Sequence, residues 1–374
     1  MKKPELLSPA GDYSALTYAI QYGADAVYIG GEDFSLRAAV RNFSEPELEK
    51  AVKFAHSKQK KIYVACNSVP RNDEVRRLPA FFEFLEDIGA DAVICSDPGV
   101  VSLAKKHCPD VKIHISTQAN VCNFVTARRW YEEGASRVVL SRELTLEEIS
   151  VIGKECPGLE LEAFVHGAVC VSHSGRCLLS NYMTGRDSNR GNCAQPCRWK
   201  YALCEETRDG QFFPVYETDT GTFILNSKDL CMIRHIPDLL SCGVSSLKIE
   251  GRAKTEYYVA CVTQAYRQAV DACFEDLSYY SEHMDDFYNE VCKVSHREYY
   301  TGFYYGDSVE NGQNYRQSSY IRDYEVIAEV VGYDSLSGCM LVKQKNKFAV
   351  GDVCEILEAG KTCLLYTSPS PRDR

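Results

Sequence analysis

Short apolar runs alternate with longer amphipathic stretches from the N-terminus to about residue 275. This alternation is typical of βα units built around a mainly parallel sheet. The pattern predicts eight strands: Glu5–Leu7, Ala26–Ile29, Lys61–Ala65, Ala92–Cys95, Lys112–Ile115, Arg137–Leu140, Glu160–Val165 and Ser246–Ile249. Eight such units predict an α/β protein with a (β/α)8 TIM-like barrel, in which polar residues that follow the strands meet on one face.

The stretches between these strands carry helix start and stop signals. Ser44 stands before Glu45 and Glu47, and Thr145 and Glu148 have the spacing of a capping box. Three helices are predicted to end in glycine at the entry to the next strand, in YGADAVYI, IGADAVIC and EGASRVVL. These signals support the alternation of helix and strand.

The barrel is predicted to occupy residues 1–275, with a cysteine-bearing insertion at 166–245 between the seventh and eighth strands. A connection of that length is usually functional. A tyrosine-rich connector is predicted at 276–323, followed by a small, truncated C-terminal β domain at 324–362. Residues 363–374, CLLYTSPSPRDR, resemble a translated sequencing adapter, and we interpret them as a non-native tail.

Four of the 18 cysteines lie in the insertion, at Cys170, Cys177, Cys193 and Cys197, with gaps of six, fifteen and three residues. The other cysteines lie mostly in apolar or helix-like segments, where a thiol packs as a small apolar side chain. The four are surrounded by glycines and polar residues, which weakens that explanation for them. Thiolates bind zinc and four-iron clusters, so the pattern predicts a metal or iron–sulfur centre.

A disulfide framework is the other explanation for clustered cysteines. The chain begins without an apolar signal run, and no stretch reaches the length of a membrane span. We therefore expect a cytoplasmic protein with no membrane partner, in which thiols stay reduced and clustered cysteines serve metal binding or catalysis.

Charge is unevenly distributed along the chain. The formal net charge of −10 argues against a protein that grips nucleic acid over its whole surface. Residues 176–200, however, carry five basic residues against one acid, a net of +4 beside the predicted metal centre. The basic residues are Arg176, Arg186, Arg190, Arg198 and Lys200. Such a patch either holds an RNA phosphate or a small dicarboxylate, or is a solvated surface.

Polar residues follow most of the predicted strands, where barrel enzymes carry their catalytic groups. They are Asn67, Asp97, Thr117, Gln118, Arg142, Glu143, His166, Glu250 and Arg252. Each of them could instead cap a helix or brace a neighbour. As a set they predict a polar mouth of the barrel.

Within this set, His166 and Glu250 are the candidate catalytic acid and base. The candidate substrate-binding residues are Arg37, Asn67, Arg142, Arg176, Lys248 and Arg252, because guanidinium groups suit carboxylates and phosphates. Lys248 lies inside the eighth predicted strand, where Glu250 or a bound anion should compensate its charge.

The segment ELEAFVHGAVCVSHSGRCLLSNY, from Glu160 to Tyr182, resembles the signature of the collagenase-like peptidases, family U32. The similarity runs from Glu5 to about Gly351, and NRGNCAQPCRW, FILNSKDL and SLKIEGR resemble its tRNA-hydroxylating branch. The resemblance implies a barrel-like catalytic domain, a 4Fe-4S cluster, and formation of 5-hydroxyuridine at the tRNA wobble position with prephenate as the hydroxyl source. Other members act on ribosomal RNA or a ubiquinone precursor, or are described as collagen-degrading proteases.

The resemblance assigns the four cluster ligands to Cys170, Cys177, Cys193 and Cys197, with Cys231 as an alternative fourth ligand. It implies tRNA and a small dicarboxylate as binding partners, and a second U32 chain is a further candidate partner. Two other functions stay open. A peptidase would use a cysteine or His166, although the sequence contains no H-E-x-x-H, G-x-S-x-G or Walker motif. A non-catalytic RNA-binding module would hold structural zinc.

Overall fold

The structure is a computed structural model of the 374-residue chain. It describes residues 3–36, 42–170, 172–199, 203–204, 212–213, 217–218, 221–222, 227–306, 320–349, 351–361 and 364–367. Two of the predicted anion-binding residues, Arg37 and Lys200, lie outside these ranges.

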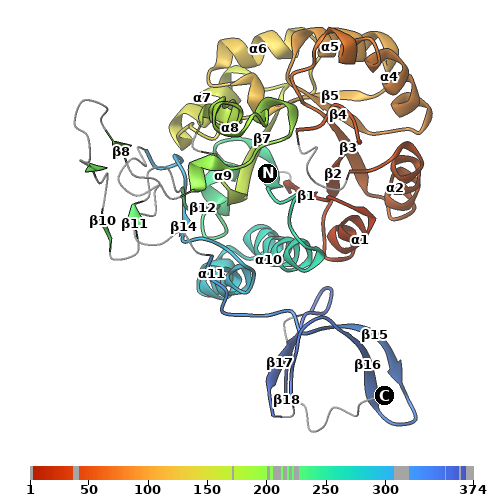
Figure 1. The fold of residues 1–374 in the computed structure, drawn as a ribbon, viewed down its shortest axis with the longest axis vertical. Coiled ribbons are helices and arrows are strands. Elements are labelled where there is room, and N and C mark those ends of the chain that lie inside the picture. The colour runs from red at the N-terminus through yellow and green to blue at the C-terminus, as the bar shows by residue number, and fades with distance from the viewer. Residues whose placement is uncertain are drawn as a thin grey trace.

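Eight parallel strands close into a barrel, with helices around it (Figure 1). They are β1 (Glu5–Pro9), β2 (Ala26–Gly30), β3 (Lys61–Cys66), β4 (Ala92–Cys95), β5 (Lys112–Ile115), β6 (Arg137–Val139), β7 (Glu160–Ala168) and β13 (Val244–Ile249). β13 pairs in parallel with both β1 and β7, which closes the ring. The eight predicted strands and the TIM-like barrel are confirmed.

The outer layer consists of helices that follow the strands. They are α1 (Tyr13–Gln21), α2 (Glu45–Ser57), α3 (Asn72–Val75), α4 (Leu78–Asp87), α5 (Pro98–His107), α6 (Phe124–Glu132), α7 (Leu146–Glu155) and α10 (Glu256–Glu275). Both predicted capping boxes are present, at Ser44 and Thr145. Asp97 accepts hydrogen bonds from the first turn of α5, so this mouth candidate serves as a helix cap.

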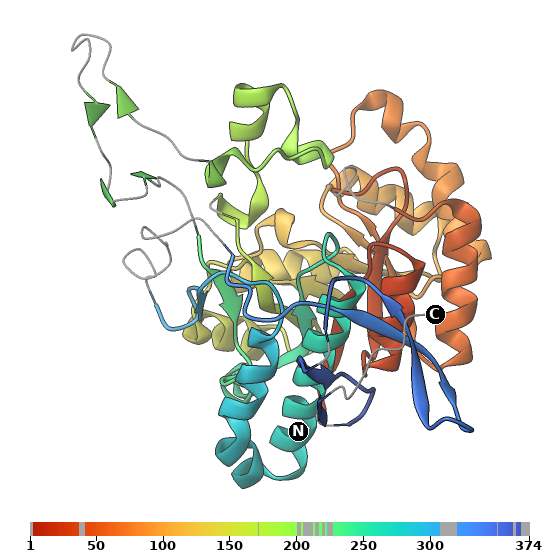
Figure 2. The same ribbon diagram turned by 60° about the horizontal axis from the view of Figure 1, so that its bottom comes forward.

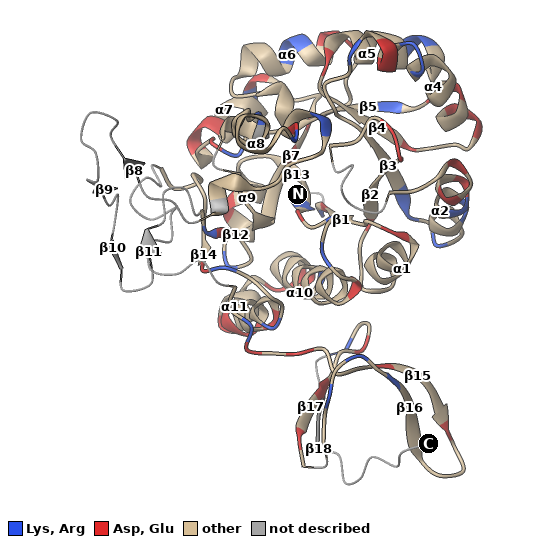
Figure 3. Ribbon diagram, in the orientation of Figure 1, with Lys and Arg blue, Asp and Glu red and all other residues tan. Residues whose placement is uncertain are grey.

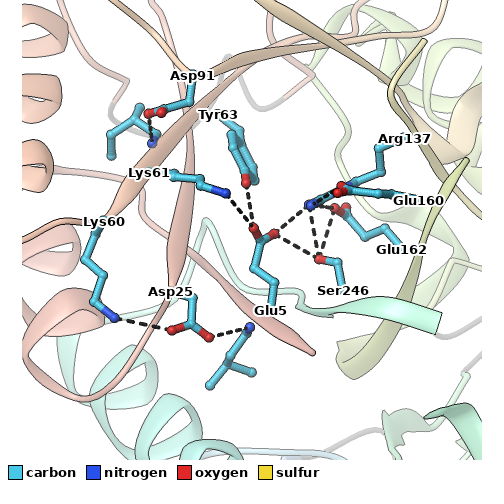
Figure 4. A network of polar contacts seen from close by, with 12 residues as sticks. Glu5, Asp25, Lys60, Lys61, Tyr63, Asp91, Arg137, Glu160, Glu162 and Ser246 are labelled. Carbon is cyan, nitrogen blue, oxygen red and sulfur yellow. Dashed lines mark hydrogen bonds and ion pairs between the residues drawn. The ribbon is translucent and has the colours of Figure 1, made fainter. Parts of the chain in front are cut away.

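The barrel interior contains a buried layer of charged side chains (Figure 4). Arg137 donates to Glu5 at 2.5 Å, to Glu160 at 2.7 Å and to Glu162 at 3.0 Å. Lys248 donates to the other oxygen of Glu162 at 2.7 Å. Burial alone would raise the pKa of Glu162, but Lys248 and Arg137 outweigh it and lower that pKa. Lys248 is thus compensated by Glu162, and the expectation that Glu250 or an anion would do so is wrong.

The insertion begins with the cysteine-bearing segment, which includes α8 (Leu179–Thr184) and stands over one end of the barrel (Figure 2). The short strands β8 (Leu203–Cys204), β9 (Phe212–Phe213), β10 (Glu217–Thr218) and β11 (Gly221–Thr222) follow. The insertion ends with β12 (Asp229–Cys231) and α9 (Ile236–Ser241). β12 pairs antiparallel with the end of β7, and this pairing extends β7 to Ala168, beyond its predicted end.

After α10 come α11 (Leu277–Cys292) and β14 (Tyr299–Tyr300), which pairs with β12. Two hairpins follow, β15 (Ala328–Asp334) with β16 (Cys339–Gln344) and β17 (Val353–Ile356) with β18 (Leu364–Thr367). They contact the helices through polar groups, for example the Tyr18 hydroxyl, which donates to Glu329 at 3.0 Å. The predicted domain boundaries and the non-native tail stay predictions. In the described part of the chain, no helix is long and apolar enough to cross a membrane.

Candidate active site at the barrel mouth

A cavity of about 100 Å³, here called the mouth cavity, lies at the carboxyl ends of the barrel strands. Its polar lining consists of Asn67, Ser116, Thr117, Gln118, Arg142, Cys170, Ser174, Ser188, Lys248, Glu250 and Arg252. Five predicted catalytic or substrate-binding residues therefore come together, from β3, β6 and β13 or the loops that follow them, and the predicted metal ligand Cys170 joins them from the loop after β7. Ser174 and Ser188 are additions that the sequence gave no signal for, because they belong to the irregular cysteine-bearing segment.

The cations of the mouth cavity outnumber its carboxylates. Arg142, Lys248 and Arg252 line it, against the single lining acid Glu250. Because Glu162 compensates Lys248, the excess lies with Arg142 and Arg252. Along the outer helices, by contrast, basic and acidic residues are interspersed (Figure 3). The excess of positive charge at the mouth is therefore local, and it favours an anionic ligand.

Arg142 is held by three kinds of contact. It donates to the carbonyl of Ala168 at 3.0 Å, lies 3.7 Å from the Glu250 carboxylate, and places its guanidinium 3.8 Å from the centre of the Phe164 ring. Its Nε is buried and has no hydrogen-bond partner among the described residues. A buried donor left without a partner carries a free-energy cost that a bound acceptor would remove.

Arg252 lies across the end of β2. It donates to the Ser35 hydroxyl at 2.6 Å and to Asn42 Oδ1 at 2.5 Å, and only 4% of its surface is exposed. A Cβ atom on Gly30 would stand 2.1 Å from Arg252 Nη2. Gly30 is therefore required for the guanidinium to occupy this position.

The side of the cavity formed by β3 and β5 carries amides and hydroxyls. Asn67 accepts from the Leu36 amide at 3.3 Å and donates to Ser116 at 3.4 Å, while Thr117 donates to the Leu140 carbonyl at 3.0 Å. The side-chain oxygen of Gln118 is buried without a partner in the described structure. This side can therefore accept and donate hydrogen bonds without adding charge.

His166 is not part of the mouth cavity, which corrects the prediction that it serves there as acid or base. It is 1% exposed, and its ring nitrogens lie 3.2 Å from the Tyr299 hydroxyl and 3.4 Å from the Tyr266 hydroxyl. Burial, with a smaller effect of nearby positive charge, lowers the pKa of His166 to about 3. It is therefore neutral near pH 7.

The cause is a shift in strand register. Lys248 of β13 faces Phe164 of β7, but the next residue, Ile249, faces His166 and not Val165. The extra residue in β7 reverses the alternation of inward and outward side chains. Phe164 consequently lines the cavity, and His166 points into the layer between the barrel and its helices.

The cysteine-bearing segment is tied to the mouth by Glu143. This carboxylate accepts from the amide of Ser174 at 2.7 Å and from its hydroxyl at 3.1 Å. Burial alone would raise the pKa of Glu143, but hydrogen bonds from Ser141 and Ser174 outweigh it and lower that pKa. Glu143 thus braces a neighbouring segment, which is the structural alternative to a catalytic role that the sequence left open for each mouth residue.

None of the four cysteines of the segment forms a disulfide in the described part of the chain. Cys170 lines the mouth cavity and is exposed, whereas the other three are half-buried. The amides of Leu179 and Gln195 point at the sulfurs of Cys177 and Cys193, at 3.4 and 3.3 Å. Such N–H groups stabilise thiolates, so the chemistry of the donor set fits a thiolate-bound metal or cluster.

The four thiols are not arranged as a coordination shell in this structure. Within the described ranges, no three His, Cys, Asp or Glu side chains form a group that could hold a metal ion. Cys231, the alternative ligand, lies in β12 with its sulfur 3.9 Å from the Tyr266 hydroxyl. Burial raises the pKa of the Cys231 thiol to about 12, as expected for a packed cysteine.

The predicted basic patch is only partly available for an anion. Arg176 is exposed and does not line the cavity, and Arg190 forms an ion pair with Glu74 at 2.6 Å. The side chain of Arg198, like Lys200 and Arg37, lies outside the described residues. The patch therefore contributes less free positive charge than its sequence suggests.

The fold and the mouth cavity define a (β/α)8-barrel protein with a cation-rich site at the catalytic face of such barrels. The chain belongs to peptidase family U32, whose model matches residues 11–314. It is 37% identical to tRNA hydroxylation protein P of Escherichia coli, over 96% of this chain and 86% of that protein.

Two further relatives carry different names. An uncharacterized protease of Methanocaldococcus jannaschii is 45% identical, over 82% of this chain and 74% of its own length. A 23S rRNA 5-hydroxycytidine synthase of Escherichia coli is 38% identical, over 73% of this chain and 40% of its own length. The solved structure of a U32 peptidase covers 66% of this chain and 93% of its own at 15% identity, with a TM-score of 0.43.

Proposed function

We propose that this chain is an RNA-modifying enzyme that hydroxylates C5 of a uridine at the tRNA wobble position, with prephenate as the co-substrate that supplies the hydroxyl group. The RNA-hydroxylation names of its relatives support the reaction class. The observation that carries the proposal is the mouth cavity, where three cations stand beside uncharged amides and hydroxyls. A site that brings together an acidic small molecule and a pyrimidine base needs both kinds of surface.

Arg142 and Arg252 are the residues that would hold the carboxylates of prephenate. Hydrogen bonds hold both side chains in place, and a planar guanidinium can bind a carboxylate through two parallel hydrogen bonds. Lys248 also lines the cavity, with its charge compensated by Glu162. Glu250, 3.7 Å from Arg142, is the carboxylate that lines the cavity and the candidate base for a proton that leaves the substrate.

Gln118 and Asn67 would contact the base. A side-chain amide offers one acceptor and two donors, which matches the N–H and carbonyl groups on the edge of uracil. The unpartnered oxygen of Gln118 makes it the stronger candidate. The uridine would have to leave its stack to reach this cavity. The cavity, of about 100 Å³, would also have to widen to hold the base together with prephenate, since pockets for small ligands usually exceed about 300 Å³.

Cys170, Cys177, Cys193 and Cys197 would hold a 4Fe-4S cluster, which would supply electron transfer or an iron site at the edge of the mouth cavity. Cys170 supports this arrangement because it lines the cavity itself. Glu143 would keep the segment docked while the other three thiols close around the cluster. A second U32 chain as partner stays a prediction.

The test is anaerobic purification of the full chain, followed by an absorption spectrum and by iron, sulfide and zinc analysis. Cys170→Ala and Cys193→Ala are the test variants, and Cys242→Ala, a half-buried cysteine outside the segment, is the matched control. We expect about four irons and four sulfides per chain, lost in both test variants and kept in the control. Prephenate-dependent formation of 5-hydroxyuridine in tRNA, measured by mass spectrometry of nucleosides, completes the test.

A colourless chain with one zinc would contradict the cluster and support a structural metal site. The peptidase alternative has less support, because its candidate residue His166 is buried among tyrosines. Peptide cleavage that survives removal of metal would restore it.

A further inference from the structure

A second cavity, of about 290 Å³, lies where the loop after β13 meets the end of α11 and the segment before β15. We call it the Ser295 cavity. Its lining combines the basic residues Lys254, Lys293 and Arg322 with tyrosines that include Tyr320 and Tyr324. Its volume is close to the lower limit of about 300 Å³ that is usual for small-ligand pockets.

Two of the cations converge on Ser295. Lys254 donates to its carbonyl at 3.4 Å, and Arg322 donates to its hydroxyl at 3.3 Å. Neither cation forms an ion pair with a carboxylate among the described residues. Both positive groups bond the same residue, and an anion bound between them would be attracted by both.

Lys293 is different, because two acids neutralise it. Glu290 lies 2.7 Å and Glu355 2.6 Å from its ammonium. With these acids counted, the Ser295 cavity has three positive and two negative groups, a net of +1, and the excess lies at Lys254 and Arg322.

Aromatic rings stand next to this charge. The Lys254 ammonium lies 4.8 Å from the centre of the Tyr320 ring, and Tyr324 is 46% exposed at the edge of the cavity. Basic groups interleaved with exposed aromatic rings are the usual means of holding single-stranded nucleic acid, through phosphate contacts and base stacking.

The Ser295 cavity adjoins the mouth cavity. Arg252 lines the mouth cavity and Lys254 lines the Ser295 cavity, two residues further along the same loop. Two residues of chain span at most about 7 Å, so the linings of the two cavities meet in this loop. Thr255, which also lines the Ser295 cavity, caps α10 and fixes the loop between them.

We propose that the Ser295 cavity binds a nucleotide that flanks the target base in single-stranded RNA. Its phosphate lies between Lys254 and Arg322, and its base stacks on Tyr324. This inference rests on the proposed function, since the mouth cavity must hold the target base for a flanking nucleotide to reach the Ser295 cavity.

The test measures the affinity of the anaerobically purified full chain for a synthetic anticodon stem-loop RNA, by fluorescence anisotropy over a range of KCl concentrations. The test variant is Lys254→Ala/Arg322→Ala. The matched control, Lys58→Ala/Lys106→Ala, removes two exposed lysines of the outer helical layer. We expect the test variant to bind about tenfold more weakly, with a salt dependence reduced by about 1 to 2 in slope, and the control to bind like the wild type.

Tyr324→Leu tests the base contact. We expect it to weaken binding of the normal stem-loop and to leave binding of a stem-loop with abasic nucleotides flanking the uridine unchanged. Equal losses in the double variant and its control, or an equal effect of Tyr324→Leu on both RNAs, would overturn the inference. Formation of 5-hydroxyuridine by the wild type would support the proposed function even if the variants overturn the inference about the Ser295 cavity. A wild type that binds RNA as expected but forms no 5-hydroxyuridine would contradict the proposed function, and RNA binding at the Ser295 cavity would still be supported.

Discussion

The buried charge layer of the barrel makes a sharp prediction about Glu162. Its side chain is fully buried and accepts from Lys248 at 2.7 Å through one oxygen and from Arg137 at 3.0 Å through the other. Glu162→Gln keeps the shape of the side chain but removes its charge. Two buried cations then lose a compensating carboxylate, and breaking a buried ion pair in this way costs about 3–5 kcal/mol of folding free energy.

Glu160 provides the matched control. It contacts the same guanidinium, at 2.7 Å, but its side chain is 48% exposed. Because water screens such a pair, Glu160→Gln is expected to cost less than about 1 kcal/mol. Urea unfolding at pH 7, followed by circular dichroism, measures both variants under the same conditions.

The pH dependence of this effect has a definite sign. The pKa of Glu162 is lowered by folding, so its contribution is present above the unfolded-state value of about 4.3 and is lost as the pH falls through the folded-state value. The difference between wild type and Glu162→Gln should therefore be constant from about pH 5 to 8 and shrink below about pH 4. Similar costs for the Glu162 and Glu160 variants at pH 7 would refute the reasoning.

Three further predictions concern the mouth and its surroundings. Gly30→Ala places a methyl group against Arg252 and should destabilise the chain by about 1–3 kcal/mol with loss of hydroxylation, measured by unfolding and nucleoside analysis. His166 has a pKa of about 3 in the folded chain, so it should lower the stability by up to about 1.4 kcal/mol per pH unit below about pH 6.5. His166→Gln should reduce the slope in acid unfolding by that amount and keep the slope that comes from His114, whose pKa burial also lowers. If prephenate is bound as proposed, Arg142→Lys loses two-pronged carboxylate binding and should raise the KM for prephenate about tenfold with little change in kcat; an unchanged KM would argue against this role.

The sequence predicted the barrel well because each strand and helix carries its own local signals. The alternation of apolar runs and the capping boxes at Ser44 and Thr145 act within a few residues, and the structure retains them. Residues that follow a strand were placed at the mouth by topology alone, which was sufficient for Asn67, Arg142 and Glu250.

The failures come from contacts between distant parts of the chain. His166 leaves the mouth because of an extra residue in β7 relative to β13, and a register shift of this kind depends on the partner strand. Glu162 was overlooked because it stands in the middle of an apolar-looking strand, and its partners Arg137 and Lys248 come from β6 and β13. The Ser295 cavity joins residues from three segments, none of which carries a motif.

Lys248 belongs both to the buried charged layer of the barrel and to the lining of the mouth cavity. Its ammonium bonds Glu162 in the charged layer and also lines the mouth cavity. The layer therefore does more than stabilise the fold, because it fixes a cation where the proposed acidic co-substrate binds. A loss of activity on changing Lys248 would consequently be ambiguous, since it removes both a substrate contact and the compensation of a buried carboxylate. Arg142, which makes no contact with Glu162, is the cation through which anion binding can be tested separately from folding.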